Sequence, residues 1–156
     1  MFFNRSKLLF VCSLFFFGSL VCAEPQKLES HEFQLCGRKM KLELARTQSE
    51  RTKGLMERAG IPSGTGMIFQ FDAPEHLVFW MKHVPFDIDI GFFDSHGKLQ
   101  SFTTMLGTSP LMQDAALPRY EGPELSLYAI EVPAGFFRAA DRKGCRLHPL
   151  PTALTK

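Results

Sequence analysis

Short apolar segments rich in aromatic and branched residues follow one another closely along most of this chain. Such segments are typical of β-strands, and turn-forming residues separate some of them, as Asp94–Gly97 does. We predict strands at Gly66–Phe71, Leu77–Met81, Ile88–Phe93, Lys98–Thr103, Tyr128–Val132 and Cys145–Leu147. Closely spaced strands with a single good helical pattern predict a mainly β fold, an antiparallel sandwich or barrel with one short α-helix.

Two earlier segments alternate apolar with polar residues and predict a β-hairpin. They are Phe33–Leu35 and Met40–Leu44, with a glycine-containing turn between them. Thr47 is followed three residues later by Glu50, which is a capping-box pattern at the start of a helix. We therefore predict a helix of about three turns that ends near Gly60.

The amino terminus has the successive zones of a secretory signal peptide. Arg5 and Lys7 precede an apolar run over Leu8–Phe17, and small residues lead to Ala23. This run is shorter than the roughly 20 apolar residues of a membrane-spanning helix. We expect cleavage after Ala23 and a periplasmic or extracellular protein without a transmembrane segment; a retained anchor and lipid attachment at Cys22 are the alternatives. The expected division is a signal peptide at 1–23, a flexible leader at 24–31, one β-rich domain at 32–150 and a tail at 151–156.

Removal of this signal leaves the chain electrically balanced. The full sequence has 18 lysines and arginines against 16 aspartates and glutamates, and the signal contains two of the basic residues and none of the acidic ones. The remainder gives no electrostatic basis for binding nucleic acid or an anionic membrane surface.

Only two of the four cysteines lie outside the signal, Cys36 near the start of the domain and Cys145 near its end. Because export delivers them to a compartment where disulfides persist, we predict that they pair. Two separate buried thiols are the alternative. Closing so long a loop would stabilise the fold by about 4 to 5 kcal/mol in the chain-entropy model.

Several linked motifs occur in one order and resemble those of a known family. They are Arg51–Arg58, Gly66–Phe69, Phe79–Lys82, Pro85–Ile88 and Glu131–Gly135. Together they resemble the family called domain of unknown function 192, over about residues 40 to 148. The resemblance implies a compact, often exported, jelly-roll-like β domain with a short helix, and it implies no established activity. The chain departs from the family pattern at His83 and Val84, where a small polar pair would be expected.

The segment from Trp80 to Asp89 has the most unusual composition. Trp80, Lys82, His83 and Asp87 lie close together around a proline, and such a cluster at the end of a strand can line a pocket. Trp80 would then form an apolar or sugar-stacking wall, and the other three would be polar contacts. The alternative is a packed tryptophan beside a solvated turn.

Other polar residues offer weaker candidate sites. Asp87 and Asp89 could share one strand face and bind a cation, or act as hydrogen-bond acceptors for backbone amides. Arg51 and Arg58 would share a face of the predicted helix, where either could bind a carboxylate or simply be solvated. The histidines lack zinc-type spacing, and no nucleophile elbow or phosphate-binding glycine loop occurs. We expect no metal and no cofactor.

Three functional hypotheses remain open. The first is a non-enzymatic protein of the cell envelope that binds a small molecule or glycan through Trp80, Lys82, His83 and Asp87, with Arg51 and Glu131 as further candidates. The second is an enzyme, for example a glycan hydrolase, that uses Asp87, Glu131 or His83 as acid and base and therefore needs two titratable groups in one cavity. The third is a structural partner of another envelope protein.

Overall fold

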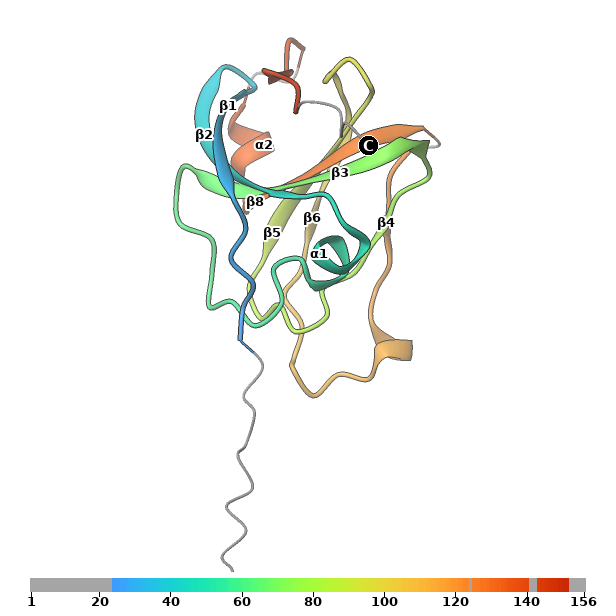
Figure 1. The fold of residues 1–156 in the computed structure, drawn as a ribbon. Helices are drawn as coiled ribbons and strands as arrows, with labels where there is room; N and C mark the ends of the chain where they lie inside the picture. Colours follow the sequence, from blue (N-terminus) through green and yellow to red (C-terminus); the bar gives the residue numbers. More distant parts are fainter. Residues whose placement is uncertain (1–23, 124, 141–142, 152–156) are drawn as a thin grey trace, which may run out of the picture.

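The computed structural model describes residues 24–123, 125–140 and 143–151 (Figure 1). The predicted signal peptide, together with residues 152–156 of the predicted tail, lies outside the described residues. In the part of the chain that is described, no helix is long and apolar enough to cross a membrane.

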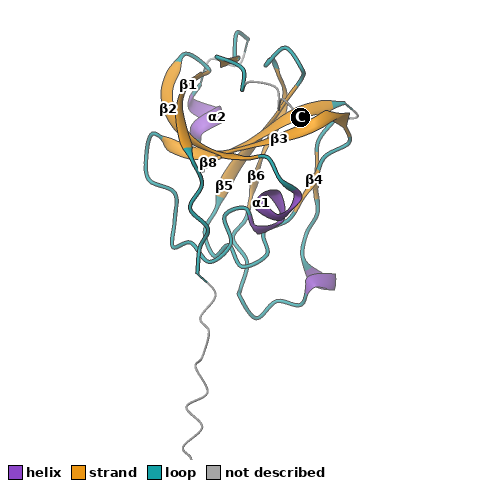
Figure 2. Ribbon diagram, in the orientation of Figure 1, coloured by secondary structure: helices purple, strands orange, loops and turns teal. Residues whose placement is uncertain are grey.

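A seven-stranded, strongly curled sheet forms the body of the protein, with the strand order β6-β5-β8-β3-β2-β1-β9 (Figure 2). Its strands are β1 (Ser30–Leu35), β2 (Arg38–Ala45), β3 (Thr65–Glu75), β5 (Ile88–Phe93), β6 (Leu99–Met105), β8 (Ser126–Pro133) and β9 (Leu147–His148). A small second sheet pairs β4 (Val78–Phe79) with β7 (Tyr120–Glu121). The helical elements are α1 (Gln48–Lys53), the 3-10 turn η1 (Asp114–Ala116) and α2 (Phe136–Ala139).

The predicted mainly β, barrel-like fold is confirmed, as is the hairpin of β1 and β2. Some details differ. β2 and β3 pair in parallel, because the segment between them carries α1 and returns the chain to the same end of the sheet. The predicted strand at 77–81 is reduced to β4, which belongs to the small second sheet, and α2 is an additional helix.

Helix α1 begins as predicted and ends earlier. The Thr47 hydroxyl accepts a hydrogen bond from the Glu50 N–H, and the Glu50 carboxylate accepts one from the Thr47 N–H, so the capping box is present. The helix stops at Gly54 rather than near Gly60, because Gly54 has a φ of 45° and cannot continue an α-helix. A Cβ at this position would lie 3.5 Å from the Phe69 ring, an ordinary contact, so the positive φ rather than crowding favours glycine here.

Both faces of the sheet are covered, and successive residues of the central strand β8 face different clusters. Tyr128, Ile130 and Val132 pack with Phe137 of α2 in one cluster. Ala129 packs in the second cluster, with Met67 and Phe69 of β3, Ile90 of β5 and Leu55 beyond α1. Glu131 alternates with Ile130 and Val132 and therefore belongs to the face of the second cluster.

The predicted disulfide is confirmed: Cys36 and Cys145 are bonded across a sequence separation of 109 residues. Cys36 lies in the turn between β1 and β2, and its N–H donates a hydrogen bond to the Arg146 carbonyl oxygen at 3.0 Å. The disulfide therefore ties the β1–β2 turn to the segment that enters β9.

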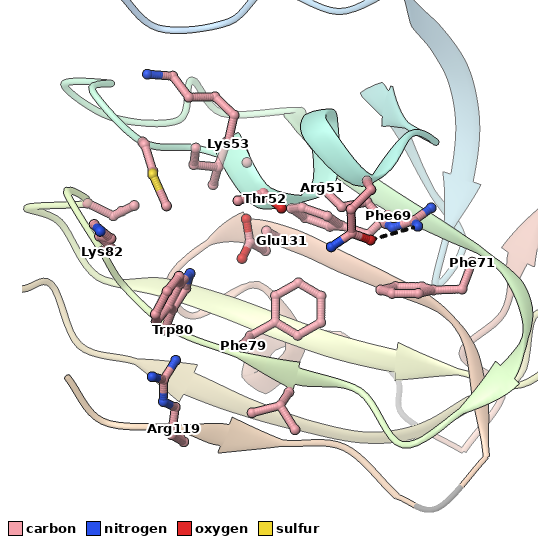
Figure 3. A pocket seen from close by; sticks show the side chains of 16 residues that line it. Arg51, Thr52, Lys53, Phe69, Phe71, Phe79, Trp80, Lys82, Arg119 and Glu131 are labelled. Atoms are coloured by element: carbon pink, nitrogen blue, oxygen red, sulfur yellow. Dashed lines mark hydrogen bonds between the residues drawn. The ribbon is translucent and has the colours of Figure 1, made fainter. Parts of the chain in front are cut away.

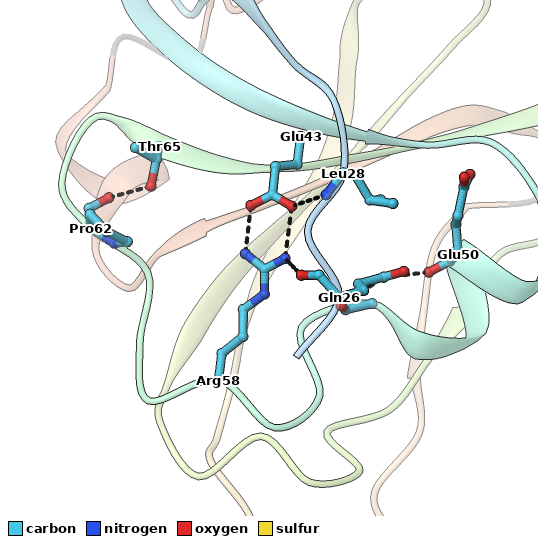
Figure 4. Close-up of polar contacts among 8 residues, drawn as sticks. Gln26, Leu28, Glu43, Glu50, Arg58, Pro62 and Thr65 are labelled. Atoms are coloured by element: carbon cyan, nitrogen blue, oxygen red, sulfur yellow. Dashed lines mark hydrogen bonds and ion pairs between the residues drawn. The ribbon is translucent and has the colours of Figure 1, made fainter. Parts of the chain in front are cut away.

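The segment before β1 is held against the domain by a partly buried ion pair (Figure 4). Arg58 donates two hydrogen bonds to the Glu43 carboxylate, at 2.6 and 2.8 Å, and a third to the Gln26 carbonyl oxygen at 2.7 Å. The Leu28 N–H donates to Glu43 at 3.0 Å, and the Gln26 side chain donates to the backbone of Glu50 and Gly54. Residues 26–28 of the predicted flexible leader are thus bonded to the domain.

The same contacts set the pKa of Glu43. Burial raises this pKa, but the hydrogen bonds from Arg58 and from the Leu28 N–H, with the positive charges of Arg58 and Lys27, outweigh burial and lower it. Glu43 is therefore ionised at neutral pH, and Arg58 is engaged here rather than beside Arg51 on one helix face.

Candidate functional site

A cleft of about 410 Å³ opens between α1, the end of β3 and the segment around β4 (Figure 3). Four of the six predicted site residues line it: Arg51, Trp80, Lys82 and Glu131. The volume is that of a pocket for a small organic molecule.

Aromatic rings form the walls of this cleft. Phe69 and Phe71 alternate with Gln70 along β3, so both point to the side of the sheet on which α1 lies. Phe79 of β4 meets Phe69 edge to face, with 5.1 Å between the ring centroids. Trp80 follows Phe79 and is half-buried at the mouth. The cleft therefore presents an apolar surface suited to a flat ligand.

The carboxyl group of Glu131 lies at the bottom of the cleft. Figure 3 shows it between α1 on one side and Phe79 and Trp80 on the other. Glu131 is only 4% exposed, because its strand is flanked by Met67 of β3 and Ile90 of β5. Among the described residues, none forms a hydrogen bond or an ion pair with the Glu131 side chain. Its carboxyl group faces the cleft.

Burial raises the pKa of Glu131 to about 8, against a smaller lowering effect of the Arg58 charge. The physical cause is the loss of water around the carboxylate, which disfavours its charged form. Near neutral pH most of the Glu131 side chains are therefore uncharged acids that can donate a hydrogen bond.

Four basic side chains, Arg51, Lys53, Lys82 and Arg119, line the cleft around this acid. The Arg119 guanidinium lies 4.3 Å from the centroid of the Trp80 ring, and the Lys82 ammonium lies 5.6 Å from it. Lys82 also forms an ion pair with Asp114 at 2.6 Å. The lining is thus strongly cationic, with one carboxyl group that is largely neutral.

Arg51 is held rigidly in this set. It donates hydrogen bonds to the carbonyl oxygens of Arg46 and Gln70, the latter at 2.9 Å, and its guanidinium lies 4.8 Å from the Phe71 ring centroid. Its buried Nε atom has no hydrogen-bond partner among the described residues. The fixed guanidinium provides a positive charge whose position does not depend on a ligand.

The structure does not bring His83 and Asp87 into the cleft. The His83 Nδ1 atom lies 2.7 Å from a Glu57 carboxylate oxygen, and both residues have positive φ angles. Asp87 accepts a hydrogen bond from the Gly107 N–H at 2.8 Å. These two side chains stabilise loops beside the cleft.

Asp89 has a structural role as well. It is fully buried on β5 and accepts hydrogen bonds from the Thr104 hydroxyl at 2.8 Å and from the Phe137 N–H of α2 at 3.1 Å. Asp87 and Asp89 are thus each bonded to a backbone amide, as the alternative interpretation of this pair expected. Among the described residues, no group of three or more His, Cys, Asp or Glu could hold a metal ion.

Sequence reasoning missed Arg119, Lys53 and Phe71 as cleft residues. Arg119 is far from Trp80 in the sequence, in a stretch without any strand pattern, and the β4–β7 pairing alone brings it to the indole ring. Lys53 lies within the Arg51–Arg58 motif, so this motif could have indicated Lys53 as a candidate site residue.

Comparisons with known proteins support the fold and leave the chemistry open. A family model described as "Uncharacterized ACR" matches residues 31–148. A Sinorhizobium meliloti protein named as a proposed transcription regulator is similar in structure, with a TM-score of 0.67, 25% identity, and coverage of 78% of this chain and 95% of that one. A Novosphingobium aromaticivorans protein of unknown function has a TM-score of 0.63 at 23% identity, covering 77% and 85%. No curated protein matches the chain.

Proposed function

The chain belongs to the family called domain of unknown function 192, and from this premise we propose that it is an exported, non-enzymatic protein that binds a small organic anion in the cleft. The observation that carries the proposal is the combination of aromatic walls with four basic side chains and a single, buried carboxyl group. An anion gains from the positive charges, and its apolar body gains from leaving water.

The residues that line the cleft favour binding over acid–base catalysis. A hydrolase of the kind considered above needs two titratable groups that can exchange protons with the substrate. Glu131 is the only carboxylate that lines the described cleft, and no histidine lines it, since His83 and Asp87 are bonded elsewhere. A lone carboxyl group among basic side chains suits recognition better.

The surroundings of Trp80 favour an anion over a neutral glycan. A sugar ring stacks on the open face of an indole. The Arg119 guanidinium lies over the Trp80 ring at 4.3 Å and so covers one of its faces. A negatively charged group can pair with that guanidinium without displacing it.

Export is supported by the signal-like amino terminus and by the disulfide, which persists in oxidising compartments. The name of the Sinorhizobium meliloti protein raises a role in transcription regulation, through nucleic acid, as a second candidate function. The balance of acidic and basic residues outside the signal gives that reading no electrostatic support.

Cleavage after Ala23 is the first testable consequence. When the full-length precursor is expressed in a bacterium with an export pathway, the periplasmic or secreted protein is expected to begin at Glu24. Intact-mass spectrometry of the purified protein measures this. A product that retains residues 1–23, or one that carries lipid at Cys22, would contradict the proposed processing.

Binding is tested with anilinonaphthalenesulfonate, an aromatic anion whose fluorescence rises in apolar sites. The exported protein is expected to bind one molecule, with energy transfer from Trp80, the only tryptophan of the chain. N-phenylnaphthylamine, which has the same rings without the sulfonate, is expected to bind about tenfold more weakly. Equal affinities for the two compounds would argue against an anion site.

A pair of matched double variants locates the site. Replacing Lys53 and Arg119 by methionine removes two cleft charges and is expected to weaken sulfonate binding about tenfold or more. Replacing Lys39 and Lys98, which are exposed and do not line the cleft, by methionine removes the same net charge and is expected to leave binding unchanged. Equal losses in both double variants would show a nonspecific charge effect and contradict the assignment.

A further inference from the structure

The Glu131 carboxyl group faces the cleft without a partner from the described residues, although it is almost fully buried. Buried polar groups in native proteins nearly always have a hydrogen-bond partner, and an unpartnered one calls for an explanation. Phe69, Phe79 and Leu55, which line the cleft with it, cannot hydrogen-bond to it. Thr52 and Trp80 also line the cleft and carry donors, but neither forms a hydrogen bond to Glu131 in the described structure. A ligand in the cleft can supply the missing partner.

The charges that face Glu131 restrict what that partner can be. Arg51 and Lys53 line the cleft from α1, Lys82 and Arg119 line it from the segments around β4 and β7, and Arg58 acts on the carboxyl group from outside the cleft. Lys82 is paired with Asp114 and Arg58 with Glu43, so Arg51, Lys53 and Arg119 are the positive charges of the cleft that repel a cationic ligand. Burial nevertheless keeps the Glu131 pKa near 8, so the side chain at neutral pH is chiefly a hydrogen-bond donor.

We propose that the ligand is a flat, conjugated anion that carries a hydrogen-bond acceptor, such as a carbonyl oxygen, at the end opposite its negative charge, and that the acid form of Glu131 donates to this acceptor. The negative charge pairs with the basic side chains, and the flat body lies between the aromatic walls. This inference rests on the proposed function of the cleft and adds the chemical class of its ligand.

The principal competitor is a zwitterion whose ammonium group pairs with ionised Glu131. Aromatic walls and a carboxylate suit an ammonium group. The two classes differ in the sign of their pH dependence. An acceptor binds the protonated acid and loses affinity as the pH rises through the Glu131 pKa, whereas an ammonium group binds the carboxylate and gains affinity over the same range.

Three matched naphthoates distinguish these possibilities. Each carries a carboxylate at one end of the ring system, and at the other end an acetyl, an isopropyl or an aminomethyl group. At pH 6.5 the acetyl compound is expected to bind the exported protein about tenfold more tightly than the isopropyl compound, which has a similar size without the acceptor. Titration calorimetry measures all three affinities.

Raising the pH from about 6.5 to 9.5 is expected to weaken acetyl binding roughly tenfold or more, with the loss beginning near pH 8. Isopropyl binding is expected to change little, which controls for general effects of pH on the mouth of the cleft. The Glu131→Gln variant keeps a donor and is expected to keep the acetyl preference without its pH dependence. The Glu131→Leu variant is expected to lose the preference.

Equal binding of the acetyl and isopropyl compounds by the wild type would overturn the inference. The inference would also be overturned if the aminomethyl compound bound most tightly, with an affinity that rises with pH and is lost in the Glu131→Gln variant. That result would identify the ligand as a zwitterion. If neither the naphthoates nor anilinonaphthalenesulfonate bind, the proposed function itself fails. Failure of the ligand class and failure of the cleft as an anion site are therefore distinguishable.

Discussion

Replacing Glu131 by glutamine is expected to raise the free energy of unfolding at pH 8 by about 2 to 4 kcal/mol, although it removes a residue of the cleft. In the unfolded chain this carboxyl group ionises near its ordinary pKa of 4.5, and in the folded protein burial raises the pKa to about 8. Between these values the folded state holds a proton that the unfolded state releases. Folding therefore becomes less favourable as the pH rises from 4.5 to 8.

The neutral amide of glutamine has nearly the same shape and does not titrate. The variant is therefore expected to resemble the wild type at pH 5 and to exceed it progressively up to pH 8. Urea unfolding followed by Trp80 fluorescence at several pH values measures both proteins. Glu43 and Glu50 do not interfere with this measurement, because their pKa values are lowered in the folded protein. Their contributions to the free energy of unfolding therefore change only below about pH 4.5.

The control for this prediction is Glu32→Gln, which changes an exposed residue of β1 in the same way. It is expected to alter stability by less than about 0.5 kcal/mol at every pH. A Glu131→Gln variant whose stability follows the same pH curve as the wild type would mean that Glu131 is ionised in the folded protein at neutral pH, and the proposed donor role would be lost with it.

Loss of the disulfide is expected to cost about 3 to 5 kcal/mol, which is a large part of the stability of a domain of this size. The bond closes a loop of 109 residues and restricts the unfolded chain strongly. The variant with both Cys36 and Cys145 replaced by alanine is expected to unfold at a much lower urea concentration than the wild type. Reduction of the wild type is expected to produce a similar loss.

The reduced wild type keeps both cysteine side chains and lacks only the bond between them. A similar stability loss in the reduced protein and in the double variant therefore shows that the loss comes from the bond and not from the smaller side chains. A thiol assay on the denatured exported protein is expected to find no free cysteine, since Cys12 and Cys22 lie in the predicted signal. The disulfide lies beside the cluster that packs on α2, away from the cleft. The folded double variant is therefore expected to bind anilinonaphthalenesulfonate normally. A stability loss below about 1 kcal/mol would contradict the chain-entropy account.

High-pH destabilisation by Glu131 has a functional explanation. Binding sites often keep groups that reduce stability, because the same groups interact with ligands. Leucine at position 131 would continue the apolar surroundings made by Met67 and Ile90, and it would remove the donor. A buried acid in the central strand is most simply explained by what it contacts in the cleft.

Local sequence patterns predicted several parts of this structure well. Thr47 and Glu50 predicted the start of α1, because the capping box depends on residues of one turn. Alternation placed Phe33 and Leu35 in a hairpin, because adjacent strands need only a short turn. Two cysteines outside the predicted signal left one intramolecular pairing. The end of α1 was harder to predict, because Gly54 is tolerated inside helices and here adopts a positive φ.

The cleft could be predicted only in part. Trp80, Lys82, Arg51 and Glu131 were named in advance, and all four line it. His83 and Asp87 were named for their closeness to Trp80 in the sequence, yet their side chains are bonded to Glu57 and Gly107. Neighbours in an irregular loop point in directions that local patterns do not fix, because loops have no repeating geometry.

The sequence by itself determined the mainly β class, the start of the helix, the disulfide pairing and the family, because each depends on short patterns or on few possible partners. Only the tertiary structure decided that Glu131 lies unpartnered beneath aromatic rings and that Arg119 covers Trp80. Those two facts depend on β8 lying between β3 and β5 and on β4 pairing with β7. Long-range pairing of this kind is selected by the packing of the whole domain, and no local segment encodes it.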